Sequence, residues 1–227
     1  MDVLTTPGFW LALLGIIWIN ILLSGDNAVV IALSARVLPP EQQKKAILLG
    51  SGAAVVLRVV LTVVASRLLA LRFLQIVGGL LLMWIGVDLL GSEEDGDGGA
   101  QEGGGLMAAV RTILMADLVM SLDNVLAVAA AAHGNTLLLV LGLALSIPMV
   151  IFGSSLMIRV MDRFPIIVMA GAALIGWVAG ETIAADASLR TVVAHHPWLP
   201  HAAAAAGGTL VLVVGLWRSR RQAQRAR

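Results

Sequence analysis

The stretch LLSGDNAVVIAL, residues 22–33, places an aspartate and an asparagine among neighbours that are almost all apolar. A charged side chain at the centre of a membrane-spanning helix costs roughly 2.5–3.5 kcal/mol on insertion scales. If this stretch crosses a membrane, Asp26 therefore needs either a compensating cation or a polar path to water.

The composition of the whole chain is that of a membrane protein. Hydrophobic residues make up 59% of the 227 residues, charged residues only 13%, and the mean hydropathy is +0.95. A spanning helix needs about 20 mostly apolar residues, so the chain can hold six or seven of them and no soluble domain. No cysteine is present, which excludes disulfides and thiolate metal sites. No basic aromatic surface indicates nucleic-acid binding.

The apolar runs are continuous and do not alternate with polar residues, which favours helices over a membrane β-barrel. We therefore predict an all-α polytopic membrane protein with seven transmembrane helices. The expected helices cover residues 9–33, 46–66, 73–91, 106–132, 136–158, 164–185 and 198–217.

The distribution of basic residues predicts an extracytoplasmic N-terminus and a cytoplasmic C-terminus. With this N-out/C-in orientation, ten Lys and Arg side chains fall in cytoplasmic segments and three fall outside. The cytoplasmic ten are Arg36, Lys44, Lys45, Arg159, Arg163, Arg218, Arg220, Arg221, Arg225 and Arg227, and the outer three are Arg67, Arg72 and Arg190.

An acidic glycine-rich segment, residues 92–105, divides the chain and is expected to be a cytoplasmic linker. It separates a first three-helix unit, residues 1–91, from a second, residues 106–186. Residues 187–227 then form an outer loop, the seventh helix and a basic cytoplasmic tail.

The two units share a motif. LLSGDNAVVIA (22–32) aligns without gaps to VMSLDNVLAVA (119–129). A weaker match joins the third helices of the units. Three spans per unit would give the units opposite orientations, and such inverted repeats are typical of secondary transporters that bind substrate near the membrane midplane. The aligned pairs are Asn20 and Asp117, Ser24 and Ser121, Asp26 and Asp123, Asn27 and Asn124, Trp84 and Trp177, and Asp88 and Glu181.

The motifs offer carboxylate, amide and hydroxyl oxygens, which suit hard divalent cations such as Mn²⁺, Mg²⁺ or Ca²⁺ and disfavour Zn²⁺ and Cu⁺. On a straight helix the aspartate of each motif lies about 100° around the helix axis from the asparagine that follows it. The polar side chains of one motif therefore do not all point toward the same site. Local unwinding at Ser24 and Gly25 would re-aim Asp26, whereas Leu122 replaces that glycine in the second motif. The thioether of Met120 would favour Mn²⁺ over Mg²⁺, although packing is the commoner role of methionine.

Helix packing gives a second interpretation, in which Asn and Ser bond across helices and each Asp pairs with an arginine. Arg58 is the candidate partner within the membrane interior. One arginine cannot neutralise three aspartates at membrane depth, so the cation site is favoured. Arg58 would then be a gate, a counter-ion of the empty site or a snorkelling residue.

The paired N-x₅-D-N and D-x₅-D-N motifs, the phrase SGDNAVVIAL and the basic QQKKA loop resemble the TerC family of integral membrane proteins, in particular its short YjbE-type branch. The resemblance implies a seven-helix inverted repeat that exports Mn²⁺ from the bacterial cytoplasm through intramembrane acidic residues. Asn20 departs from it, because the family usually has an acidic residue there. The resemblance marks Asp26, Asn27, Asp117, Asp123 and Asn124 as metal-site residues.

We expect a secondary transporter of the bacterial inner membrane that exports a divalent cation, first of all Mn²⁺, by alternating access. Proton coupling, the choice among divalent cations and the oligomeric state stay open. The expected partners are the cation, protons and the bilayer, with no cofactor. Further candidates for the metal shell or the ion path are Asn20, Ser24, Ser121, Met120, Arg58, Asp88 and Glu181.

Three other functions have less support from the sequence. An exporter of small organic cations or amino acids would use Trp84 and Trp177 as aromatic walls. A membrane assembly factor would tolerate Asp26→Asn. An intramembrane enzyme is not expected, because the sequence lacks G-x-S-x-G and H-E-x-x-H motifs and a core histidine.

Overall fold

The structure is a computed structural model that describes residues 7–22, 25–68, 71, 73–91, 104–131 and 136–225. Within these residues all regular structure is helical, which confirms the all-α class. The helices are α1 (Pro7–Leu22), α2 (Gly25–Arg36), α3 (Pro40–Leu68), α4 (Leu74–Gly91), α5 (Gly104–Ala131), α6 (Thr136–Arg163), α7 (Ile166–Ala184), α8 (Arg190–His195) and α9 (Leu199–Arg225).

Six helices are long and apolar enough to cross a membrane, namely α3, α4, α5, α6, α7 and α9, which confirms a multi-pass membrane protein. The prediction of one continuous helix over residues 9–33 was wrong. The chain forms α1 and α2 there, and the apolar part of α1, Phe9–Trp18, is too short to span alone. Residues 23 and 24, which include Ser24 of the expected Ser-Gly pair, lie between the two helices and outside the described residues.

Helix ends differ from the sequence prediction where the chain leaves the membrane. α3 begins at Pro40 and α9 continues to Arg225, because hydropathy marks the apolar span while Glu, Gln, Lys and Arg prolong a helix into water. The short helix α8 was not predicted. Residues 92–103 of the expected linker lie outside the described residues.

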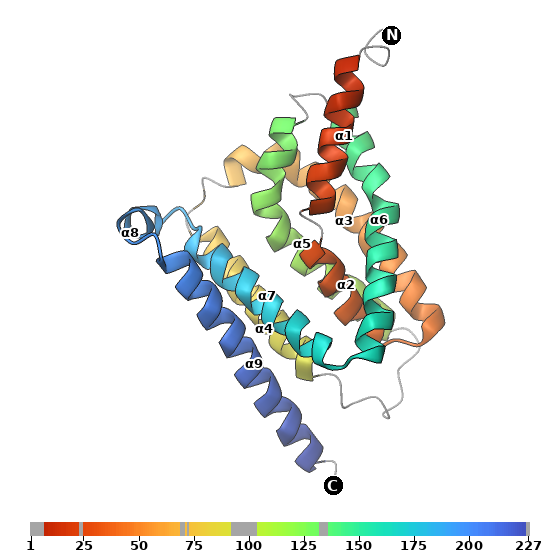
Figure 1. Cartoon of the computed structure of the whole chain (residues 1–227), viewed down its shortest axis with the longest axis vertical. Helices are drawn as coiled ribbons and strands as arrows, with labels where there is room; N and C mark the ends of the chain where they lie inside the picture. The colour runs from red at the N-terminus through yellow and green to blue at the C-terminus, as the bar shows by residue number, and fades with distance from the viewer. Residues whose placement is uncertain are drawn as a thin grey trace.

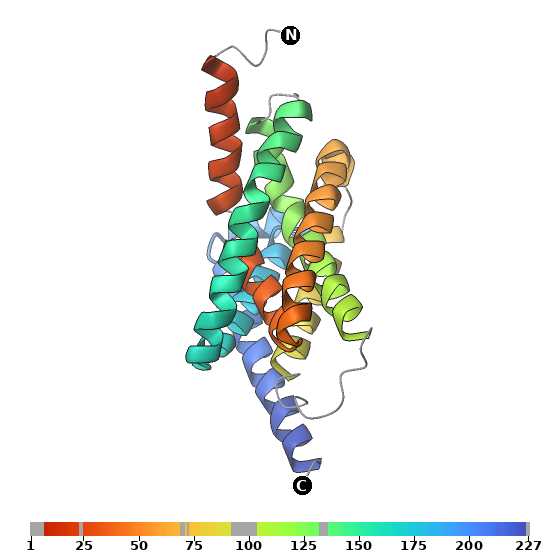
Figure 2. The ribbon, with the colours of Figure 1, turned by 90° about the vertical axis from the view of Figure 1, so that its right-hand side faces the viewer.

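The helices form two groups that lie side by side (Figures 1 and 2). In one group α7 packs against both α4 and α9, and α4 also contacts α9. In the other, α3 packs against α5, and α6 packs against α1, α2 and α3. The groups meet where α2 touches α7 and α4 touches α5. The second group holds the buried ion pair of Arg58 and Asp117.

Small residues allow α7 and α9 to approach closely. Gly176 and Gly180 are one helical turn apart on α7, and α9 presents Ala203 and Gly207 to them. A Cβ atom at Gly176 would lie 2.5 Å from the carbonyl oxygen of Gly207, and one at Gly180 would collide with the carbonyl oxygen of Ala203. Such close backbone packing is a main source of helix association in membranes, where lipid offers no hydrophobic driving force.

Asp186, fully buried just after α7, caps the start of α4. Its Oδ1 accepts the backbone N–H of Phe73 at 3.1 Å, and Oδ2 accepts those of Gln75 and Ile76 at 3.1 and 3.4 Å. Ser188 adds its backbone N–H at 2.8 Å and its hydroxyl at 2.7 Å. Burial raises the pKa of the Asp186 carboxyl, but the bonds from Ser188, Phe73 and Ile76 outweigh it and lower this pKa to about 2. The carboxylate thus joins the end of α7 to the start of α4, where the helix leaves N–H groups unpaired.

We predict that Gly180→Ala lowers the free energy of unfolding by about 1–3 kcal/mol, because the new methyl group forces the α7 and α9 backbones apart. SDS titration of the purified protein in mixed micelles measures the change. Gly52→Ala is the matched control, because a Cβ atom at Gly52 meets nothing within 4 Å. Equal stabilities of the two variants would contradict the close packing.

We predict that Asp186→Asn costs about 1–2 kcal/mol of stability at neutral pH, because the amide cannot accept all of these bonds. The pKa of this carboxyl is lower in the folded protein, about 2, than its ordinary 3.8. The stabilisation is therefore complete above about pH 4 and disappears as the pH falls toward 2. The test is to measure the free energy of unfolding of wild type and variant from pH 7 to pH 2. If the difference between the two proteins is the same at pH 2 as at pH 7, the charge of Asp186 does not contribute to stability.

Candidate functional site

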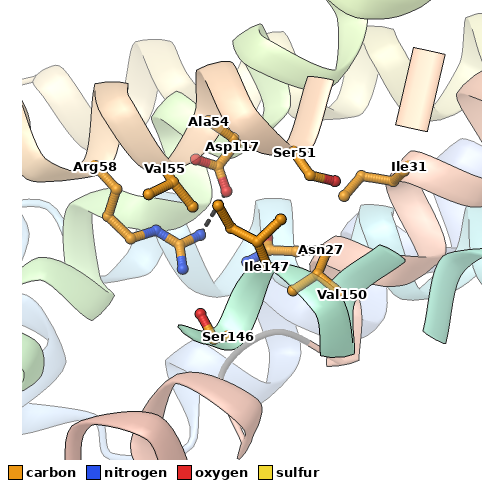
Figure 3. Close-up of a pocket in the computed structure, with 10 residues that line it drawn as sticks. All are labelled: Asn27, Ile31, Ser51, Ala54, Val55, Arg58, Asp117, Ser146, Ile147 and Val150. Carbon is orange, nitrogen blue, oxygen red and sulfur yellow. Dashed lines mark hydrogen bonds and ion pairs between the residues drawn. The ribbon is translucent and has the colours of Figure 1, made fainter. Parts of the chain in front are cut away.

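A small cavity lies between α2, α3, α5 and α6, inside the second helix group. Its volume is about 20 Å³, which is enough for one water-sized guest. Figure 3 shows polar side chains from all four helices around it. It is lined by Asn27, Ile31, Ser51, Ala54, Val55, Arg58, Asp117, Ser146, Ile147 and Val150.

An ion pair forms one wall of this cavity. Arg58 Nη2 on α3 donates to Asp117 Oδ1 on α5 at 2.5 Å, and the residues are only 5% and 6% exposed. Ser121, one turn further along α5, accepts from Arg58 Nε at 3.0 Å and donates to Asp117 Oδ2 at 3.1 Å. Among the residues that the structure describes, Arg58 is the only buried Lys or Arg. The structure thus gives Asp117 a fixed cationic partner.

Asp26 lies in the first turn of α2, where it is partly buried. Its Oδ1 accepts the backbone N–H of Asn27 at 2.8 Å, and the positive end of the helix dipole favours its negative charge. The carboxylate is also close enough to Arg58 and Asp117 to interact with their charges. The side chain of Asn27 is buried and reaches the cavity. The start of α2 thereby places a carboxylate within electrostatic reach of the buried cluster.

Two serines at the cavity were missed by sequence reasoning. Ser51 on α3 is 3% exposed, and its hydroxyl has no hydrogen-bond partner among the described residues. Ser146 on α6 is equally buried and donates to the carbonyl of Leu143 at 2.7 Å. Hydroxyls are common in membrane helices, so nothing in the sequence marked these two above the others.

Part of the predicted site lies outside the described side chains. This holds for Asn20, Asp123 and Asn124, while Ser24 is outside the described residues altogether. The backbone of α5 continues as helix through Asp123 and the whole of the second motif. Within the described residues no group of three His, Cys, Asp or Glu side chains gathers closely enough to hold a metal ion.

Three other candidates lie away from the cavity. Met120 packs in the apolar core. Asp88 forms an ion pair with Arg218 of α9 at 3.2 Å, and both side chains are substantially exposed. Glu181 accepts the indole N–H of Trp177 at 2.9 Å on the exposed side of α7. None of the three lines the cavity.

The fold and the site together define an all-helical, multi-pass membrane protein with a buried ion pair between two of its helices. Comparison of sequences places the chain more closely. The model of the integral membrane protein TerC family matches residues 5–224, so this chain belongs to that family.

Two relatives from Bacillus subtilis (strain 168) are similar to the chain. "Uncharacterized membrane protein YjbE" is 43% identical over 188 residues, which cover 83% of this chain and 86% of that protein. "Uncharacterized membrane protein YceF" is 28% identical over 187 residues, which cover 78% and 72%. No solved structure matches the chain.

We predict that Ser121→Ala lowers the free energy of unfolding by about 1–3 kcal/mol, because Arg58 and Asp117 each lose a buried hydrogen bond. Ser155→Ala is the matched control, since that hydroxyl bonds only to the carbonyl of Ile151 in its own helix. Chemical unfolding in mixed micelles gives both values. Equal losses would mean that the buried network adds nothing to stability.

Proposed function

We propose that the protein is a secondary transporter that exports a hard divalent cation, first of all Mn²⁺, by alternating access. Protons would be transported in the opposite direction. The observation that carries this proposal is the cavity for a single small guest within an apolar bundle, lined by Asn27 and Asp117 of the two motifs. A dehydrated metal ion fits such a volume, and carboxylates that exchange Mn²⁺ for protons recross the membrane with reduced charge.

The chemistry of the available donors supports a hard cation. Asp26 and Asp123 would supply the negative charge, and the amide oxygens of Asn27 and Asn124 the neutral ligands. Ser51 adds a buried hydroxyl that has no partner among the described residues. Oxygen sets of this kind suit Mn²⁺, Mg²⁺ and Ca²⁺. Met120 packs in the core, so it offers no reason to prefer Mn²⁺ among them.

An inverted repeat would give this site its two exits, and the helix packing supports it. In the proposed repeat α1 and α2 together correspond to α5, α3 to α6, and α4 to α7. If the two halves are equivalent, the contact between α3 and α5 should have a counterpart between α6 and the pair α1 and α2. Both contacts are present in the structure. With α1 and α2 counted as one crossing, the chain would cross the membrane seven times.

The distribution of charge supports the N-out/C-in orientation in a bacterial inner membrane. The basic ends of α2, α6 and α9 lie at the lower end of the molecule, opposite to the N-terminus (Figure 1). Arg36 ends α2 and Arg163 ends α6. This end would face the cytoplasm, where the positive-inside rule places basic residues.

The competing functions have less support. Organic cations or amino acids need more space than about 20 Å³. Trp84 and Trp177, the residues expected to form aromatic walls, are 57% and 39% exposed and do not line the cavity. We likewise infer that the protein is not an enzyme, since two aspartates without a nucleophile or core histidine make a weak catalytic set.

We expect bacterial cells that express the wild type to contain less Mn after a Mn²⁺ load than cells with an empty vector. Asp26→Asn combined with Asp123→Asn should reduce the efflux rate about tenfold or more, because each ionised ligand contributes more than about 1.4 kcal/mol to cation binding. Intracellular Mn measured by mass spectrometry gives the result.

Asp162→Asn is the matched control, since Asp162 is an exposed carboxylate near the end of α6. Membrane abundance of each variant is measured in parallel. If the double variant at normal abundance exports Mn²⁺ as fast as the wild type, these carboxylates are not the site and the proposed function fails. Tolerance of both substitutions would instead favour the assembly factor.

A further inference from the structure

We propose that Asp117 is not a metal ligand but the permanent counter-ion of Arg58, and that this pair fixes the charge of the site at −2, the value that one divalent cation neutralises. This inference rests on the proposed function, and it changes the role that the sequence indicated for Asp117. It assigns to Arg58 and Asp117 the control of how much charge the site accepts.

The first argument is that both oxygens of Asp117 already accept hydrogen bonds. One oxygen accepts from Arg58 and the other from Ser121, which also holds the guanidinium in place. A metal ion bound to Asp117 would compete with the buried arginine for the same negative charge. Removing one partner of a buried ion pair is strongly unfavourable, because the remaining charge stays in a low-dielectric surrounding.

The second argument comes from contacts that occur twice in the molecule. A Cβ atom at Gly50 of α3 would collide with Ile113 of α5, and one at Gly142 of α6 would collide with Ile16 of α1. Ile16 and Ile113 are 97 positions apart, the same spacing as Asp26 and Asp123. Gly50 and Gly142 are 92 positions apart and define the register between α3 and α6.

Hydrogen bonds on the same two helices give the same register. The hydroxyl of Thr62 donates to the carbonyl of Arg58 at 2.7 Å, and the hydroxyl of Ser154 donates to the carbonyl of Val150 at 2.8 Å. Thr62 and Ser154, like Arg58 and Val150, are 92 positions apart. Arg58 and Val150 also both line the cavity. Val150 is therefore the counterpart of Arg58.

The counterpart of Asp117 is Asn20, 97 positions earlier. One half of the molecule thus carries both the acid and the arginine, and the other half carries Asn20 and Val150 and so neither charge. The two members of an ion pair are expected to be present together or absent together, because either one alone would be an uncompensated buried charge. An aspartate that served only as a metal ligand would have no such link to an arginine.

The charges can then be counted. Asp26, Asp117 and Asp123 contribute three negative charges and Arg58 one positive charge, which leaves −2. Asp117→Asn alone changes this sum to −1, and Arg58→Val alone changes it to −3. The two substitutions together restore −2 and reproduce the uncharged pair of the other half.

The test compares Mn²⁺ binding by the purified full-length protein and its three variants, measured by calorimetry in detergent at pH 7. We expect Asp117→Asn to weaken binding about tenfold or more, since a positive charge then stands unopposed beside the cation. The double variant Arg58→Val/Asp117→Asn should recover to within about threefold of wild type. A double variant that folds but binds as weakly as Asp117→Asn would show that Asp117 ligates the metal.

A second measurement separates this inference from the proposed function. Unfolding of the same four proteins without metal gives the coupling between Arg58 and Asp117, which we expect to be favourable, with the double variant more stable than either single one. Wild type that binds no Mn²⁺ would overturn the proposed function, whereas additive stability changes would overturn the ion-pair role. If the single variants do not fold, folding and Mn²⁺ binding of the double variant decide the result.

Discussion

Charge neutrality in a low-dielectric interior is the constraint on which the rest of this structure depends. Three aspartates within apolar helices would oppose membrane insertion unless each negative charge met a positive one. The chain supplies one of these itself, since Arg58 crosses from α3 to Asp117 on α5 and Ser121 completes the hydrogen bonding. The remaining negative charge is the basis of the proposed cation site.

The two helix groups are built from different kinds of residues. Around α7, glycine and alanine bring backbones into contact, and Asp186 joins the ends of α7 and α4. Around the cavity, side chains from α2, α3, α5 and α6 meet across a small space. Backbone contact leaves little room for rearrangement around α7, whereas the cavity leaves unfilled space in the other group.

The sequence predicted helix boundaries well where the length of an apolar run sets them. It predicted them less well where the conformational preferences of a few residues set them. α4 and α7 lie almost where hydropathy placed them. The expected span over residues 9–33 is divided between α1 and α2, and a hydropathy average does not show such a division. Asp186 was missed because its partners at Phe73 and Gln75 are more than 100 positions away, and only folding brings them together.

The sequence by itself determined that the chain is a helical membrane protein of the TerC family with a duplicated DN motif, because apolar length, charge and repetition are properties of the chain alone. Only the tertiary structure decided which charges meet. The sequence marked Asp117 as a metal-site residue together with Asp26 and Asp123, yet it lies against Arg58, 59 positions away. The physical reason is that the electrostatic energy of a buried charge depends on distances in space, which the order of residues does not specify.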